Sequence, residues 1–126
     1  MSRSPDSGIY AMDFKMSEPQ QHGPILLLEL SGRLDGRAAQ ALQQRCSEIR
    51  NQGFQRLALD LSRITFLASS GLGVFLAETE EFSEAGGSLS LVDPSTVVSA
   101  VMKLLNVDRF LSIVSSIEEL KSSISS

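Results

Sequence analysis

Two adjacent serines, Ser69 and Ser70, have the clearest potential for chemistry in this sequence, because a Gly-Leu-Gly segment follows them directly. A serine hydrolase would need a glycine two residues before the nucleophile, and position 67 holds a leucine. It would also need a histidine base. The only histidine, His22, falls in an expected turn. We therefore predict that the chain catalyses no reaction of its own.

Other reactive side chains favour structural roles. Gly71 and Gly73 begin a G-x-G-x-x-G pattern, but residue 76 is a leucine and the chain has no Walker lysine. We expect these glycines to let a helix pack closely on a sheet. Cys46 falls on an apolar helical stripe without a neighbouring histidine, which indicates a buried thiol. Four carboxylates are predicted to form a solvated helix face: Glu78, Glu80, Glu81 and Glu84.

Composition limits the classes of partner. The 126 residues include 11 Lys and Arg against 15 Asp and Glu, a net charge of −4 without a basic cluster, so neither nucleic acid nor an anionic membrane is expected as a partner. One cysteine and one histidine exclude a Cys/His zinc site, and we expect no metal or cofactor. No apolar run reaches the ~18 residues of a membrane span. These features predict a small, acidic, cytoplasmic protein.

Hydrophobic periodicity predicts alternating strands and helices. Strands are expected over residues 10–16, 25–30, 57–61 and 89–92, with a polar turn around His22. Helices are expected over residues 37–52, 71–84 and 95–105, and near the C-terminus around 114–124. The inward stripe of the first helix should be Ala38, Ala41, Leu42, Cys46 and Ile49. That of the third should be Val97, Val98, Val101, Met102 and Leu105.

The order of these elements, β-β-α-β-α-β-α-α, predicts an α/β fold with a mixed sheet of about four strands and four helices. Residues 1–8 should be a flexible N-terminal segment, and residues 9–126 a single domain. Function in such open sheets sits beyond the carboxyl ends of the strands. Two expected loops qualify, residues 31–37 and residues 62–71.

The segment from Leu59 to Leu76, LDLSRITFLASSGLGVFL, resembles the signature of STAS domains, specifically the bacterial anti-sigma factor antagonists. Their pattern is an L-D/N-L strand followed by F-x-D-S-S/T-G-L-G-V-L. Ser31–Asp35 (SGRLD) is similar to the family's T/S-G-x-L-D, and Gly86–Val92 (GGSLSLV) to its G-G-x-L-x-L-V. Val107–Leu120 is similar to its C-terminal ending. The resemblance covers roughly residues 9–125.

The resemblance implies a protein–protein switch. The family's first motif serine, matched by Ser69, is phosphorylated by an anti-sigma factor that is also an ATP-dependent serine kinase; Ser70 is a second candidate. The unphosphorylated antagonist binds the kinase, phosphorylation releases it, and a metal-dependent serine phosphatase resets it. Asp35 matches a kinase-contacting position, with helix capping as its structural alternative. The expected partner-binding residues are Asp35, Phe66, Leu67, Ala68, Ser69, Ser70, Gly71 and Leu72.

Ala68 departs from the family pattern, which has Asp before the serine. The intact Ser69–Gly73 segment favours retained phosphorylation. The alternative is a STAS subunit that is not phosphorylated and stays docked on an ATPase or another partner complex. A purely structural interpretation of the motif has one serine as the N-cap of the following helix. The sequence does not identify the sigma factor or other output, the upstream signal or the oligomeric state.

Overall fold

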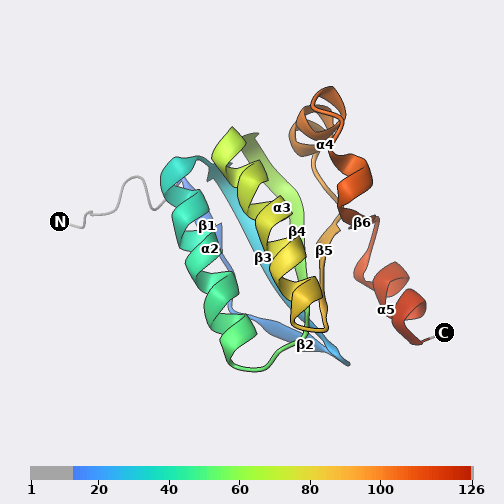
Figure 1. Ribbon diagram of the computed structural model, residues 1–126. Coiled ribbons are helices and arrows are strands. Elements are labelled where there is room, and N and C mark those ends of the chain that lie inside the picture. The colour runs from blue at the N-terminus through green and yellow to red at the C-terminus, as the bar shows by residue number, and fades with distance from the viewer. Residues whose placement is uncertain (1–12, 126) are drawn as a thin grey trace.

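Six strands form one sheet in the computed structural model, which describes residues 13–125 (Figure 1). The strands are β1 (Phe14–Met16), β2 (Gln20–His22), β3 (Ile25–Leu34), β4 (Arg56–Leu67), β5 (Ser88–Val92) and β6 (Ser112–Val114). The helices are α2 (Gly36–Asn51), α3 (Ser69–Glu84), α4 (Thr96–Leu104) and α5 (Ile117–Ser125), with a 3-10 turn, η1 (Asp108–Phe110). The predicted α/β class and its four α-helices are confirmed.

The sheet has the strand order β1-β3-β4-β5-β6, and β2 also pairs with β3. β3, β4, β5 and β6 run parallel, whereas β1 and β2 pair with β3 in the antiparallel sense. The two strands beyond the predicted four are β2 and β6. Each has only three residues, too few to show a period in the sequence.

The two central strands run further than the sequence indicated. β3 continues to Leu34 and β4 to Leu67, so the expected loops over 31–37 and 62–71 are mostly strand. Register shifts between Glu29 and Ser31, and again between Gly32 and Arg33, place extra residues on β4. Such bulges interrupt the alternation of side chains, which hid the strand from a periodicity argument. The connections to the helices shrink to Asp35 and Ala68.

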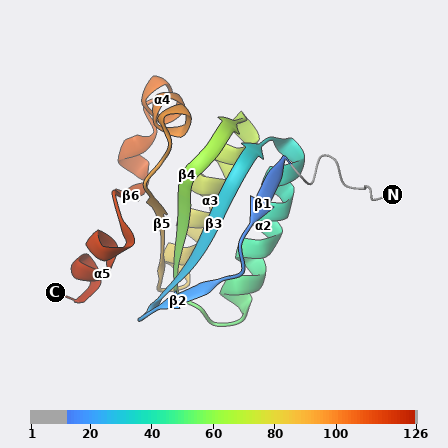
Figure 2. The same cartoon turned by 180° about the vertical axis from the view of Figure 1, so that it is seen from behind.

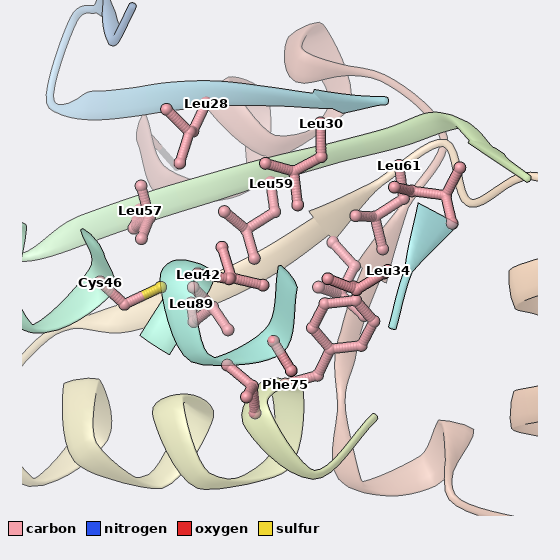
Figure 3. Packing of buried hydrophobic residues seen from close by; sticks show 14 of the residues in the cluster. Leu28, Leu30, Leu34, Leu42, Cys46, Leu57, Leu59, Leu61, Phe75 and Leu89 are labelled. Carbon is pink, nitrogen blue, oxygen red and sulfur yellow. The ribbon is translucent and has the colours of Figure 1, made fainter. Parts of the chain in front are cut away.

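Helices α2 and α3 cover one face of the sheet (Figure 1). Leucines from β3, β4 and β5 meet Leu42 and Cys46 of α2 and Phe75 of α3 in the main core (Figure 3). Truncating one of these buried leucines to alanine would cost about 2–5 kcal/mol. On the opposite face Leu120 of α5 packs against Ile25 and Leu27. Figure 2 turns the molecule so that this second face is toward the reader, with β1 and the upper parts of β3 and β4 in front of α2 and α3.

Several predictions about buried faces are corrected. In α2, Ala39 rather than Ala41 completes the buried stripe. In α4, Val98 and Met102 are buried, but Val97 and Leu105 are exposed, so the expected inward stripe is wrong for both. α4 lies at the margin of the sheet and buries only one narrow side (Figure 1).

Two serines at helix starts fix the C-terminal half of the fold. Ser95 caps α4 by accepting from the Val98 amide at 3.3 Å, and its hydroxyl donates to the Ile64 carbonyl of β4 at 2.7 Å. Ser116 accepts from the Glu119 amide at the start of α5. The Glu119 carboxylate in turn accepts from Ser115, and these hydrogen bonds lower the pKa of that carboxyl. The predictions of a flexible segment over residues 1–8 and of a strand at residues 10–12 lie outside the described residues.

Candidate functional site

The starts of α2 and α3 lie side by side at the carboxyl ends of two parallel strands. The amide of Ala68, at the end of β4, donates to the carbonyl of Leu34, at the end of β3, over 3.0 Å. A Cβ placed on Gly36 would lie 3.7 Å from the Ser70 hydroxyl, so the two first turns nearly touch. The sequence placed the site at this edge, and the geometry brings its two segments together.

Ser69 and Ser70 are the first two residues of α3, and both are exposed. Neither hydroxyl makes a hydrogen bond with any residue between 13 and 125. The capping position belongs to Ala68, whose side chain makes no capping bond. The structural interpretation of a serine as the N-cap is therefore wrong. The first amides of a helix lack partners within the helix and form its positive end, which favours an anion nearby.

Asp35 caps α2, because its carboxylate accepts from the Ala38 amide at 3.0 Å. The structural alternative given for this residue is thus confirmed. Asp35 remains partly exposed, so a contact with another protein stays a prediction that capping does not exclude. Its negative charge lies at the start of the helix adjacent to α3, where a second anion on Ser69 or Ser70 would meet like-charge repulsion.

The apolar residues of the motif divide into buried and accessible groups. Leu67 and Leu72 are buried, and a Cβ on buried Gly71 would lie 2.8 Å from Leu34 Cγ. These three residues lie beneath the serines and are not part of the accessible surface. Phe66 is half-buried, with the Arg33 guanidinium 4.2 Å from its ring centroid. The accessible part is therefore smaller than the set expected from sequence. It comprises Asp35, Phe66, Ala68, Ser69 and Ser70, which we call the serine ledge.

The remaining reactive groups lie away from this ledge. His22 lies on β2 and pairs with Ile25, the first residue of β3. Leu34 is at the other end of this ten-residue strand, about 30 Å from Ile25. Cys46 is fully buried, and its burial, followed by the charge of Glu78, raises the pKa of the thiol to about 12. Within residues 13–125, no three His, Cys, Asp or Glu side chains gather as a metal site. No helix of this part of the chain is long and apolar enough to span a membrane.

The prediction of a solvated carboxylate face on α3 is wrong for Glu78. This residue is 2% exposed, and its carboxylate pairs with the Arg50 guanidinium of α2. Arg50 also lies over the Phe82 ring, 5.5 Å from its centroid. The sequence contained a sign that Glu78 is buried, because residues 75, 78 and 82 have the three- and four-residue spacing of one helical face. Phe75 and Phe82 on that face are both buried.

Comparisons with known proteins find relatives that are named as anti-sigma factor antagonists. A protein 27% identical over 88 residues, which span 69% of this chain and 75% of its own, is the anti-sigma F factor antagonist of Paenibacillus polymyxa. A Thermotoga maritima protein provisionally named an anti-sigma factor antagonist is 35% identical over 57% of this chain and 64% of its own length.

Solved structures share the fold. An anti-sigma factor antagonist from Mycobacterium paratuberculosis superposes with a TM-score of 0.78 at 20% identity, covering 90% of this chain and 95% of that one. The antagonist SpoIIAA in its unphosphorylated form gives 0.71 at 21% identity, over 90% and 97%. Its phosphorylated form from Bacillus gives 0.65 at 21% identity, over 87% and 98%. A model of the STAS domain matches residues 16–120, and the chain belongs to the STAS domain family.

Proposed function

We propose that this protein is an anti-sigma factor antagonist whose serine ledge binds an anti-sigma serine kinase and is released when Ser69 is phosphorylated. The observation that carries the proposal is the Ser69 hydroxyl, which is exposed at the first turn of α3 and bonded to no residue of the described chain. The names of the aligned relatives support the antagonist part of this role. In this role the protein is a substrate and binding partner, not an enzyme.

The proposed reaction transfers the γ-phosphoryl group of ATP to Ser69 Oγ. A bond forms between Oγ and the γ-phosphorus, the bond from that phosphorus to the β–γ bridging oxygen breaks, and the hydroxyl proton passes to the kinase's base as ADP leaves. In the reverse half of the cycle, a metal-dependent phosphatase directs water at the phosphorus. The Oγ–P bond breaks, inorganic phosphate is released, and the hydroxyl is restored. The use of ATP places this cycle in the cytoplasm.

Phosphorylation should act on the partner rather than on the fold. The phosphate adds about −1.5 to −2 charges at neutral pH, and the free amides of the α3 N-terminus stabilise an anion there. Ser69 is exposed, so the phosphate group has room in the free protein. In a complex it would introduce a hydrated dianion beside Asp35. A loss of ~3 kcal/mol would weaken binding more than a hundredfold.

The discriminating experiment incubates the full chain with a candidate anti-sigma kinase and ATP, then maps phosphate by tandem mass spectrometry. Incorporation at Ser69, lost in Ser69→Ala and retained in Ser70→Ala, supports the switch. The two variants are matched because both hydroxyls are exposed and unbonded. Modification of Ser70 alone would contradict the assignment of Ser69.

One observation favours a second function, that of a STAS subunit docked constitutively without phosphorylation. Ala68 supplies no side-chain hydrogen bond at the position before Ser69. A kinase that needs a carboxylate there would leave this chain unmodified. The test compares wild type with Ala68→Asp in the presence of ATP and the candidate partner. If wild type binds stably without incorporating phosphate, and Ala68→Asp incorporates it, this alternative is established and the switch is overturned.

A further inference from the structure

The face of the sheet turned away from α2 and α3 is covered only in part by the described residues. Leu120 of α5 packs on Ile25 and Leu27, at the amino end of β3. Toward the carboxyl end, β1 and the upper parts of β3 and β4 have no helix in front of them (Figure 2). Side chains alternate along a strand, so Ser31 and Arg33 point to the same side as Leu27 and lie on this open part.

Three cationic side chains, far apart in the sequence, meet on the open part of the sheet. Lys15 of β1 pairs with Ser31 of β3, which pairs with Arg63 of β4, so these residues form one row across three strands. Arg33 follows on β3 and lies over Phe66, its guanidinium 4.2 Å from the ring centroid. The three cations are exposed, and none forms an ion pair with a residue between 13 and 125. We call these five residues the bare sheet face.

A cavity of about 230 Å³ is lined by Lys15 and Arg63, together with Ser31 and Glu29 among others. Because neighbouring strands lie about 4.8 Å apart, the Cα atoms of Lys15 and Arg63 are roughly 10 Å apart, and both long side chains can reach one group above Ser31. Pockets for small molecules usually span about 300–1,000 Å³, so this smaller space suits a single side chain of another protein. Two cations and a hydroxyl donor favour a carboxylate.

Acidic neighbours limit which anions can bind at this row. Glu29 and Asp60 pair with each other in the next row toward the amino end of β3, and Asp13 directly precedes β1. A nucleic acid or an anionic membrane spreads its charge over a wide area and would meet these carboxylates as well, on a chain whose net charge is −4. A protein can place one acidic side chain at Lys15 and Arg63 and hydrogen-bond donors at Glu29. Charge complementarity therefore selects an acidic protein segment.

We propose that the bare sheet face binds an acidic segment of a partner protein, with one carboxylate of that segment held between Lys15 and Arg63. The carboxylate accepts hydrogen bonds from both cations and from the hydroxyl of Ser31. Arg33 and Phe66 extend the contact toward the serine ledge, to which Phe66 belongs, and arginine and aromatic side chains are enriched at protein interfaces. The inference requires neither phosphorylation of the ledge nor a partner that is a kinase.

The test is an NMR titration of the full chain with a blocked peptide of sequence GSEFESG, whose glutamates supply the carboxylate. The backbone amides of Lys15, Ser31 and Arg63 should shift. Lys15→Gln combined with Arg63→Gln should weaken binding at least about tenfold. Lys103→Gln combined with Arg109→Gln removes the same charge from two other exposed cations and should leave the affinity nearly unchanged. A peptide that shifts none of these three amides, or that binds both double variants equally, would overturn the proposal.

A second peptide tests the carboxylate without altering the protein. GSQFQSG has the same shape and no charge, and it should not shift the amides of the bare sheet face. Equal shifts with both peptides would refute recognition of a carboxylate.

Phosphatidylserine vesicles and a short DNA duplex test the other anions. Neither should bind. Binding of either one, lost in the Lys15→Gln and Arg63→Gln variant, would assign the face to a polyanion instead and overturn the proposal.

Discussion

The backbone amide of Ala68 donates a hydrogen bond to the carbonyl oxygen of Leu34 over 3.0 Å. This bond joins the ends of two parallel strands directly before their helices begin at Gly36 and Ser69. It fixes the start of α3 against the start of α2, so the position of the Ser69 hydroxyl relative to Asp35 is set by sheet geometry rather than by a flexible loop. A docking surface that is already fixed in this way loses little conformational entropy when a partner binds.

Replacing Ser69 with aspartate should leave the fold intact. A carboxylate in the first turn of α3 interacts favourably with the helix dipole, worth about 0.3–1 kcal/mol. Repulsion from Asp35 offsets part of that gain, so the free energy of unfolding should stay level or rise slightly. Ser83→Asp, in the last turn of the same helix, is the control and should destabilise by a similar amount. Urea denaturation measures both. A clear loss of stability in Ser69→Asp would show that an anion at this position disturbs the fold itself.

Gly71→Ala should destabilise the protein by about 1–3 kcal/mol, because the new Cβ would lie 2.8 Å from Leu34 Cγ and 2.9 Å from Leu67 Cδ1. Gly73→Ala, two residues later in the same helix, is a matched control. No atom lies within 4 Å of its Cβ position, and alanine there should stabilise by about 0.5–1 kcal/mol. Opposite signs of the two changes in a denaturation midpoint are expected. Equal effects would contradict the close approach at Gly71.

Breaking the ion pair between α2 and α3 should be costly. Arg50→Met leaves the Glu78 carboxylate buried without a partner and should lower the free energy of unfolding by about 3–5 kcal/mol. The exposed pair of Arg45 and Glu48 provides the comparison, and Arg45→Met should cost less than about 1 kcal/mol. Adding Glu78→Leu to Arg50→Met should recover most of the loss, since no charge then remains buried. A double variant as unstable as the single one would argue against this account.

Stability should fall at alkaline pH through Cys46. The pKa of this thiol is raised from 9.0 to about 12, mainly by burial, so above pH 9 the unfolded chain loses a proton that the folded chain keeps. The contribution is fully present below pH 9 and is lost progressively between about pH 9 and 12, roughly 4 kcal/mol in all. Denaturation across this range should show a shallower decline for Cys46→Ala than for wild type. Parallel curves would mean that the thiol ionises equally in both states.

Much of the site follows from local sequence. The Ser69–Gly73 segment places two hydroxyls directly before a helical pattern, and strand order places that junction at the carboxyl edge of a sheet. The helical spacing identified Cys46 as buried. Two features escaped this reasoning. The bulges in β4 broke the two-residue period, and the charge of Glu78 concealed its position on the apolar face of α3.

The sequence by itself determined the order of the main elements, the α/β class and the residues at the start of α3, because these depend on periodicity and on neighbours along the chain. Tertiary structure alone decided which motif residues reach the surface. Leu67 and Leu72 became buried, and Asp35 came to lie near the serines, only once β3 and β4 were paired. It also left one side of α4 uncovered. Burial is a property of how elements pack, and contacts between residues 30 or more positions apart leave little trace in the local pattern that a single sequence displays.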